Sequence, residues 1–204
     1  MQHRARLAER ALARLAESEP QIRVRAIAAN TGSVAQHVAD GTVEIGLGFA
    51  SAATPGVRLE AIAHVPAVAA VAADDPVAAR ESVALAELAG RRFAQVDAHD
   101  GPGYNDAVRE LCREAGFEPA LADQASGPMA WETAVRGGDC VGLTTRVSAA
   151  STVRGIRTIE LEEQALFRID LLTPETAEGR LSAAARSFAE AARAVSGPVI
   201  RAAS

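Results

Sequence analysis

The sequence contains no lysine, and all 21 of its basic residues are arginine. Aromatic residues make up only 3% of the chain, and there are two cysteines, Cys112 and Cys140. Two thiols without CxxC spacing predict neither a disulfide framework nor a zinc site, so we expect both to be packed in the core. From these residues we expect no metal ion and no cofactor.

The chain also lacks a surplus of positive charge and a long apolar run. Its formal net charge is -5, whereas a domain that holds nucleic acid typically carries a basic surplus or stripe, so direct contact with nucleic acid is not expected. The N-terminal segment MQHRARLAERALARLAE is amphipathic and charged throughout, unlike a signal peptide. No apolar run approaches the length of a membrane span. These absences predict a cytoplasmic protein with no membrane partner.

The order of patterns along the 204 residues predicts an α/β fold. Hydrophobic residues make up 49% of the chain, which is ordinary for a globular protein with one large or two small cores. Strand and helix patterns alternate twice, and this alternation predicts parallel sheets in two Rossmann-like lobes joined by crossing strands. We assign lobe I to residues 1–64 plus 173–204, and lobe II to residues 65–172.

Several elements are predicted from local patterns. In residues 21–29, Ile22, Val24 and Ala26 alternate with arginines, which is typical of a strand. Glycines that follow helical patterns predict helix ends at Gly41 and Gly116. We expect the other helices at 3–17, 34–41, 104–116, 128–138 and 180–195, and the other strands at 42–50, within 57–76, and in the segments RRFAQVD, ALADQAS, CVGLTTR, IRTIELEE and LFRIDLLTP.

Small polar residues follow four of the predicted strands, just before a helix or loop. Because the carboxyl ends of parallel strands share one edge of a sheet, we expect hydroxyl groups, helix N-terminal N–H groups and one cation to converge there. Such groups suit a small carboxylate or a similar anion. The side chains concerned are Thr31, Ser33, Asp97, His99, Ser126, Thr144 and Arg146.

Each of these residues also has a purely structural interpretation. Thr31, Ser33 and Ser126 are good N-cap residues, and capping alone would explain them. Asp97 would brace the following loop, His99 would be solvated, and Arg146 would be a surface arginine. Both interpretations stay open for every position.

Catalytic motifs are absent from the sequence, which has no HExxH, GxSxG or P-loop and no GxGxxG at the start of a helix. The spacing does not support a Cys140–His99 nucleophile pair. Met129 and Trp131 are expected to pack, or to form the wall of a pocket. We therefore expect no enzyme activity, and Asp97, His99 and Glu132 are the residues to test for acid–base chemistry.

The ordered motifs resemble the effector-binding (regulatory) domain of LysR-type transcriptional regulators. The segment QIRVRAIAANTGSVAQHVADGTVEIGLGF resembles the family's first lobe. The segments REAGFEPAL and AVRGGDCVGLTTR are similar to its "aGf-x-P" and "vaaG-x-Gvallp" patterns, and RLSAAARSFAEAARAV resembles its closing helix. The resemblance covers roughly the whole chain.

This resemblance implies the type 2 periplasmic-binding-protein fold, a ligand sensor in transcription regulation, and a homodimer. The small-molecule effector would lie between the lobes, and a carboxylate or an aromatic acid is the expected class. The positions that would line its site are Thr31, Ser33, Phe49, Asp97, His99, Ser126, Met129, Thr144 and Arg146.

The chain departs from the family pattern in three ways. Glu44 stands where the family has Asp, and Thr145 or its neighbour replaces the proline after the "Gvall" strand. The family's winged helix-turn-helix, its linker helix and the first strand of its regulatory domain, which all precede the position of residue 1, have no counterpart at the N-terminal end. The C-terminal VIRAAS resembles that strand, so one hypothesis is that residues 198–204 take its place and bring Ser204 near the effector. A frayed tail is the alternative.

Three other functions stay open, because a fold does not fix a function. The chain could be a solute-binding protein of the same fold, a prephenate-dehydratase-like lyase, or a dimerisation partner with a vestigial pocket. Turnover of a bound acid would favour the enzyme, whereas saturable binding without turnover would favour the sensor.

Overall fold

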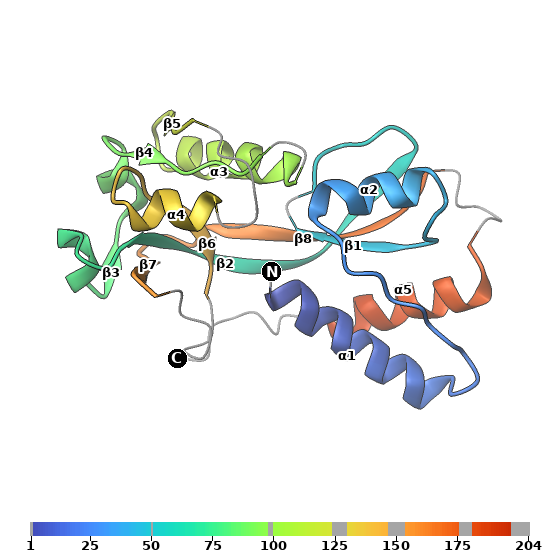
Figure 1. The fold of residues 1–204 in the computed structure, drawn as a ribbon. Helices are drawn as coiled ribbons and strands as arrows, with labels where there is room; N and C mark the ends of the chain where they lie inside the picture. The colour runs from blue at the N-terminus through green and yellow to red at the C-terminus, as the bar shows by residue number, and fades with distance from the viewer. Residues whose placement is uncertain are drawn as a thin grey trace. The chain divides into compact units, whose positions relative to one another are not determined.

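The computed structural model describes residues 2–49, 51–97, 100–123, 130–146, 154–175 and 181–196. The chain divides into two compact units, the first formed by Met1–Val65 with Arg168–Ser204 and the second by Pro66–Phe167. Each unit combines strands with helices (Figure 1), which confirms the predicted α/β class. The strands β2 (Val57–Ala72) and β8 (Leu166–Pro174) each contribute residues to both units.

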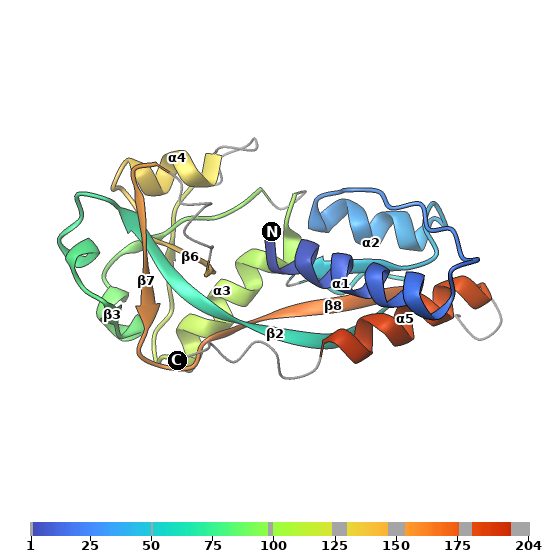
Figure 2. The ribbon, with the colours of Figure 1, turned by 90° about the horizontal axis from the view of Figure 1, so that it is seen from below.

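Helix packing forms much of the core of the first unit. The helix α1 (Gln2–Ser18) lies against α5 (Ala183–Val195), and both views of the ribbon show the two side by side (Figures 1 and 2). Leu7, Ala11 and Leu15 recur at intervals of four and are buried on the same face of α1. The facing side of α5 buries mainly alanines, and these small side chains let the two helices approach closely.

The predicted strand at residues 21–29 is wrong, because the segment contains no strand. Its alternation of side chains is correct for a strand, but a strand also needs a partner for its backbone N–H and C=O groups. Among the residues that the structure describes, 23–28 pair with no other segment, and Val24 and Ile27 stay 47% and 45% exposed. The predicted strand at 42–50 is shorter in the structure, where β1 covers Gly46–Phe49.

The strand β2 runs through a densely packed region. Its residues from Val65 to Ala72 are nearly all fully buried, and most of them are alanine or valine. Within the second unit, β2 pairs with β6 (Gly142–Thr145) and with β7 (Ile156–Leu161). Continuous apolar runs of this kind are typical of strands that are covered on both faces.

The expectation of parallel sheets is wrong for several of the ladders. The pairs β1–β8, β2–β6 and β2–β7 are antiparallel. Parallel pairing is found between β3 (Ser82–Val83) and β7, and between β4 (Arg92–Phe93) and β5 (Ala120–Leu121). A hydrophobic pattern reports which residues face a core but not the direction of the neighbouring strand, so the alternation alone could not set these directions.

The predicted helix ends and the state of the thiols are confirmed. The helices α2 (Thr31–Ala39) and α3 (Pro102–Glu114) are followed closely by Gly41 and Gly116, whose φ angles are 77° and 90°. Cys112 and Cys140 are free and buried, and burial raises the pKa of both thiols, that of Cys112 to about 12. Both thiols therefore stay protonated and unreactive at neutral pH.

The remaining helices are η1 (Pro76–Ala79), η2 (Leu85–Leu88) and α4 (Ala130–Arg136). None of the helices in the described ranges is long and apolar enough to cross a membrane.

Asp75 fixes the start of the short helix η1. Its Oδ1 accepts a hydrogen bond from the Val77 N–H at 2.9 Å, and its Oδ2 pairs with Arg91 Nη2 at 2.7 Å. The side chain is only 6% exposed. The hydrogen bond from Arg91 holds the pKa of the Asp75 carboxyl below its usual range.

We predict that Asp75 makes stability depend on acidity. Because its folded pKa is lowered, its contribution is complete above the ordinary carboxyl pKa of about 4 and is lost as the pH falls through the folded value. In urea unfolding at stepped pH, wild type should therefore lose more free energy of unfolding on acidification than Asp75→Asn. The matched control is the exposed neighbour in Asp74→Asn, which should keep the wild-type slope. Equal slopes in all three proteins would contradict the prediction.

Candidate functional site

Three short parallel segments of the second unit end at the same edge. The Ala94 N–H donates to the Val141 carbonyl at 2.7 Å, and the Ala122 N–H donates to the Phe93 carbonyl at 2.8 Å. These bonds place Phe93 between Leu121 and Val141, and all three segments run in the same direction there. Two predicted residues, Asp97 and Thr144, follow these paired positions at the carboxyl side of their segments, which is the side where ligands bind in open α/β proteins.

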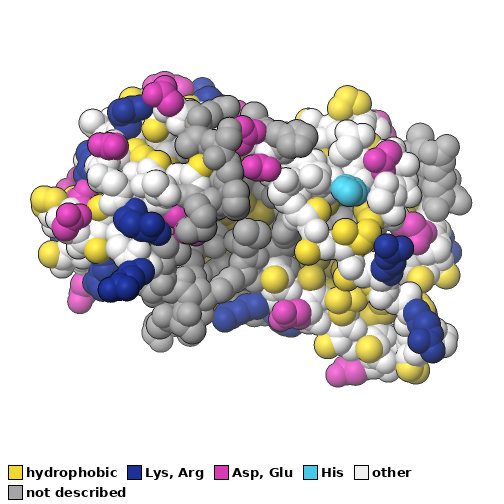
Figure 3. All heavy atoms as spheres, in the orientation of Figure 1, with side chains coloured by type: hydrophobic (Ala, Val, Ile, Leu, Met, Phe, Trp, Pro, Cys, Tyr) yellow, Lys and Arg dark blue, Asp and Glu magenta, His cyan; other side chains and the backbone are white. Residues whose placement is uncertain are grey.

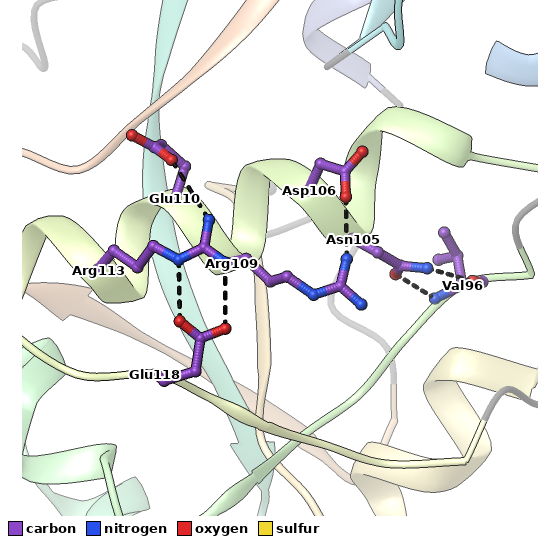
Figure 4. A network of polar contacts seen from close by, with 7 residues as sticks. All are labelled: Val96, Asn105, Asp106, Arg109, Glu110, Arg113 and Glu118. Carbon is purple, nitrogen blue, oxygen red and sulfur yellow. Dashed lines mark hydrogen bonds and ion pairs between the residues drawn. The ribbon is translucent and has the colours of Figure 1, made fainter.

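A side-chain amide fixes the backbone that leads to Asp97. Asn105 Nδ2 donates to the Val96 carbonyl at 2.9 Å, and the Val96 N–H donates to Asn105 Oδ1 at 3.1 Å (Figure 4). The Asp97 carbonyl also accepts bonds from the N–H groups of Asp100 and Gly101, each at 3.0 Å. Sequence reasoning missed Asn105, and the only signal for it was an amide in the first turn of a helix after a glycine-containing loop.

The outer face of α3 carries charged pairs instead. Arg113 Nε bonds Glu118 Oε2 at 2.9 Å, and Arg109 Nη1 bonds Asp106 Oδ1 at 2.9 Å (Figure 4). All four side chains are substantially exposed, so these pairs contribute little to stability. The inner face, with Tyr104 and Asn105, is therefore the one that shapes the edge.

Tyr104 joins three elements beneath this edge. Its Oη donates to the Leu143 carbonyl of β6 at 2.6 Å and accepts a hydrogen bond from Trp131 Nε1 of α4 at 3.0 Å. Its ring stacks on Phe167 with the centroids 6.0 Å apart. Burial raises the pKa of Tyr104, so the hydroxyl stays a neutral donor. The structure thus places Trp131 in a packing role, and a Cβ on Gly142 would collide with its indole ring.

The end of β6 presents one hydroxyl and one cation. Thr144 is half-buried, Thr145 is buried at 4% exposure, and Arg146 is exposed. Arg146 Nη2 pairs with Glu160 Oε2 of β7 at 2.7 Å, with about half of each side chain in solvent. An ion pair this exposed is weak, so an anion could compete for the guanidinium.

In the first unit, the N-cap of α2 is Asn30 rather than a hydroxyl residue. Asn30 Oδ1 accepts a hydrogen bond from the Ser33 N–H at 2.7 Å. The capping interpretation of Ser33 is therefore wrong, and its half-buried hydroxyl has no part in the cap. The first turn of α2 contains no acidic residue, so its positive dipole end is not neutralised from within the helix.

A buried carboxylate holds the turn after β1. Asp170 is fully buried, its Oδ2 accepts from the Ser51 N–H at 2.9 Å, and its Oδ1 pairs with Arg168 Nε at 2.5 Å. Arg168 Nη2 also donates to the Ser51 carbonyl at 3.1 Å. The predicted site residue Phe49 is half-buried at the last position of β1, immediately before this turn. Sequence reasoning missed this trio, although an aspartate within the apolar strand LFRIDLLTP was a signal.

Several predicted positions lie outside the described residues. They are His99, Ser126, Met129, the side chain of Thr31, and the C-terminal segment 198–204 with Ser204. Of the acid–base candidates that are described, Glu132 lies on α4 and is 4.0 Å from Arg136. The described part of the chain contains no group of three or more His, Cys, Asp and Glu side chains that could hold a metal ion.

Comparison with known proteins identifies relatives of the chain. Residues 5–197 match the family described as "LysR substrate binding domain". The "Uncharacterized HTH-type transcriptional regulator YnfL" of Escherichia coli (strain K12) is 27% identical over 170 residues, which cover 83% of this chain and 57% of that protein. The chain thus spans little more than half of that relative's length.

Two solved structures share the fold. The "Effector binding domain of QuiR in complex with shikimate" superposes with a TM-score of 0.73 at 14% identity, covering 91% of this chain and 88% of that one. The "BenM effector binding domain with its effector benzoate" superposes with a TM-score of 0.68 at 16% identity, covering 93% and 85%. At such low identity, these likenesses concern the fold alone.

We predict that the Tyr104 hydroxyl stabilises the second unit. Tyr104→Phe leaves the Leu143 carbonyl and the Trp131 N–H without their partner, which should lower the free energy of unfolding by about 1–3 kcal/mol. A double-mutant cycle with Trp131→Phe, followed by circular dichroism in urea, isolates the contact between the two side chains. A coupling energy of about 0.5 kcal/mol or more is expected, and strict additivity would contradict the contact.

We also predict that Asp170 is essential to the turn after β1. Asp170→Ala leaves the Ser51 N–H and the Arg168 guanidinium without their partner and should lower the free energy of unfolding by about 3 kcal/mol. Asp123→Ala is the matched control, because Asp123 also pairs with an arginine but is fully exposed. Asp123→Ala should change the free energy of unfolding little. An equal loss in both variants would show that the burial of Asp170 does not cause the loss of stability.

Proposed function

The chain belongs to the LysR substrate binding domain family, and from this membership we propose that it binds a small carboxylate or aromatic acid as an effector. The family match over residues 5–197 is the observation that carries the proposal. Shikimate and benzoate, the ligands of two fold relatives, are both carboxylic acids and support the chemical class.

The second unit offers groups for one part of such a ligand. Asn105 holds the carbonyl of Val96, which precedes Asp97, and Tyr104 holds the carbonyl of Leu143, which precedes Thr144. Both proposed binding residues would therefore be positioned before a ligand arrives. The Thr144 hydroxyl would donate to a carboxylate, and Arg146 would supply a bidentate cation once it leaves Glu160. Asp97 would accept a hydrogen bond from a hydroxyl or amino group of the ligand. We also propose roles in binding for His99, Ser126 and Met129.

The first unit offers a second, different set of groups. The N-terminus of α2, with Thr31 and Ser33, would attract a carboxylate through its backbone N–H groups and its dipole. Phe49 would contact an apolar ring. The two sets are proposed independently, and the variants below test each by itself.

The proposed role is sensing rather than catalysis, in a homodimer that regulates transcription. The chain itself would not contact DNA, in keeping with its net charge of -5. Sedimentation of the purified chain tests the dimer, and loss of the added acid, followed by chromatography, would reveal turnover.

We predict that carboxylic acids raise the thermal midpoint of the chain. Benzoate and shikimate are compared with the neutral analogues benzamide and methyl shikimate, so that each pair keeps the ring while the carboxylate charge is removed. A ligand at about 100 times its Kd adds roughly 2.7 kcal/mol of stability. A dose-dependent shift for an acid but not for its neutral analogue is expected. If neither the acids nor a wider carboxylate panel shift a cooperative transition, the chain is not a carboxylate sensor.

Variants locate the binding groups. Thr144→Val and Arg146→Gln should each weaken binding about tenfold or more, whereas Arg157→Gln removes another exposed arginine of the second unit and should have no effect. Glu160→Gln frees Arg146 and should strengthen carboxylate binding. Ser33→Ala tests the first unit. If Thr144→Val and Arg146→Gln both bind carboxylates with wild-type affinity, the end of β6 is not part of the binding site.

A further inference from the structure

An open groove of about 590 Å³ lies within the first unit. Its two long walls are the segment 23–29 and the segment 41–47, which leads into β1. Side chains of α1 and α5, among them Leu12, Ala185 and Phe188, complete the lining. In the space-filling view, hydrophobic side chains gather on this unit between the positions of α2 and α1 (Figure 3). The groove is thus formed by a single unit and is separate from the β6 edge.

Both long walls carry backbone groups that lack a strand partner. In the described part of the sheet, β1 is the terminal strand and is paired with β8 on one side only. Across the groove, residues 23–28 have a strand-type alternation but no partner. Rows of unpaired N–H and C=O groups are templates for another strand. Two such rows facing one groove would pair with both edges of a single inserted strand.

The side chains around the groove are also suited to a strand with apolar residues. Val24 and Ile27 are the large hydrophobic side chains that stay exposed in the described chain, and both line the groove. Ile45 and Leu47 are half-buried and, like Phe188, pack against a buried cluster that includes Leu171 and Ala189. An inserted Val or Ile would cover these side chains, whereas water leaves them exposed.

The chain contains a segment of suitable composition and reach. Eight residues, GPVIRAAS, follow Ser196. The helix α5 lines the groove at Ala185 and ends at Val195, which places its end about 15 Å further along the helix axis. Eight extended residues reach about 26 Å. A Gly–Pro pair favours a reversal of the chain, and Val199 and Ile200 are favoured in strands.

We propose that residues 199–204 insert into this groove as a strand between residues 23–28 and β1. The insertion would complete the sheet of the first unit and turn residues 23–28 into the strand that their pattern predicts. The proposal is independent of effector binding, since it rests on the groove and the two unpaired walls.

Hydrogen exchange of the 204-residue chain, read by mass spectrometry, tests the insertion. In wild type, amides in peptides covering 23–28, 46–49 and 199–204 should exchange at least about tenfold more slowly than unstructured reference peptides. Ile200→Asp should remove this protection from the peptides covering 23–28 and 199–204, and should lower it in 46–49, where only the amides that bond to β8 stay protected. The double variant Val199→Ile with Ile200→Val is the matched control, because it keeps the apolar character, and it should retain the protection.

The groove wall gives a reciprocal variant. Val24→Asp changes a side chain that is exposed in the structure, so the unit should still fold, yet residues 199–204 should lose protection. Exchange of 199–204 at the reference rate in folded wild type would overturn the proposal. Protection of 23–28 and 46–49 that persists in Ile200→Asp and grows with protein concentration would overturn it as well, because a second copy would then cover the groove.

Discussion

The fold depends on the pairing and burial of one strand, β2. Its Ala/Val-rich stretch from Val65 to Ala72 is almost completely excluded from water, so each backbone N–H and C=O group there must be satisfied by a neighbouring strand. β6 and β7 supply this pairing in the second unit. Because the side chains of β2 are small, the neighbouring elements approach it closely. On β6, the missing side chain of Gly142 leaves room for the indole ring of Trp131.

Much of the architecture could be predicted because it follows from local patterns. The spacing of Leu7, Ala11 and Leu15 predicted α1, and the glycines at 41 and 116 predicted two helix ends. The direction of pairing could not be predicted, since a strand pattern contains no information about its partner. Residues 21–29 were wrongly predicted as a strand for the same reason. Their side chains alternate as in a strand, but a strand forms only where a partner strand is present.

The candidate site could be predicted only in part. The polar residues at strand ends predicted Asp97 and Thr144 as site residues, and both follow parallel segments that pair at Phe93 and Val141. The groups that fix this edge were missed because their partners are backbone atoms, which leave no trace in the sequence. The Asn30 cap was missed for the same reason, because its partner is the backbone N–H of Ser33. The Ser51–Arg168–Asp170 trio was missed because Ser51 and Asp170 are 119 residues apart and meet only after folding.

Tyr104 and Asn105, the anchors of the second-unit edge, hold it through main-chain atoms. Tyr104 bonds the Leu143 carbonyl, and Asn105 bonds the N–H and C=O groups of Val96. Every amino acid offers that same carbonyl, so replacement of the side chain at 143 cannot delete the acceptor. The residues exposed at the edge are thus free to diverge between lineages while the backbone beneath them keeps its shape. A scaffold of this kind lets natural selection exchange one ligand preference for another without first having to rebuild the fold.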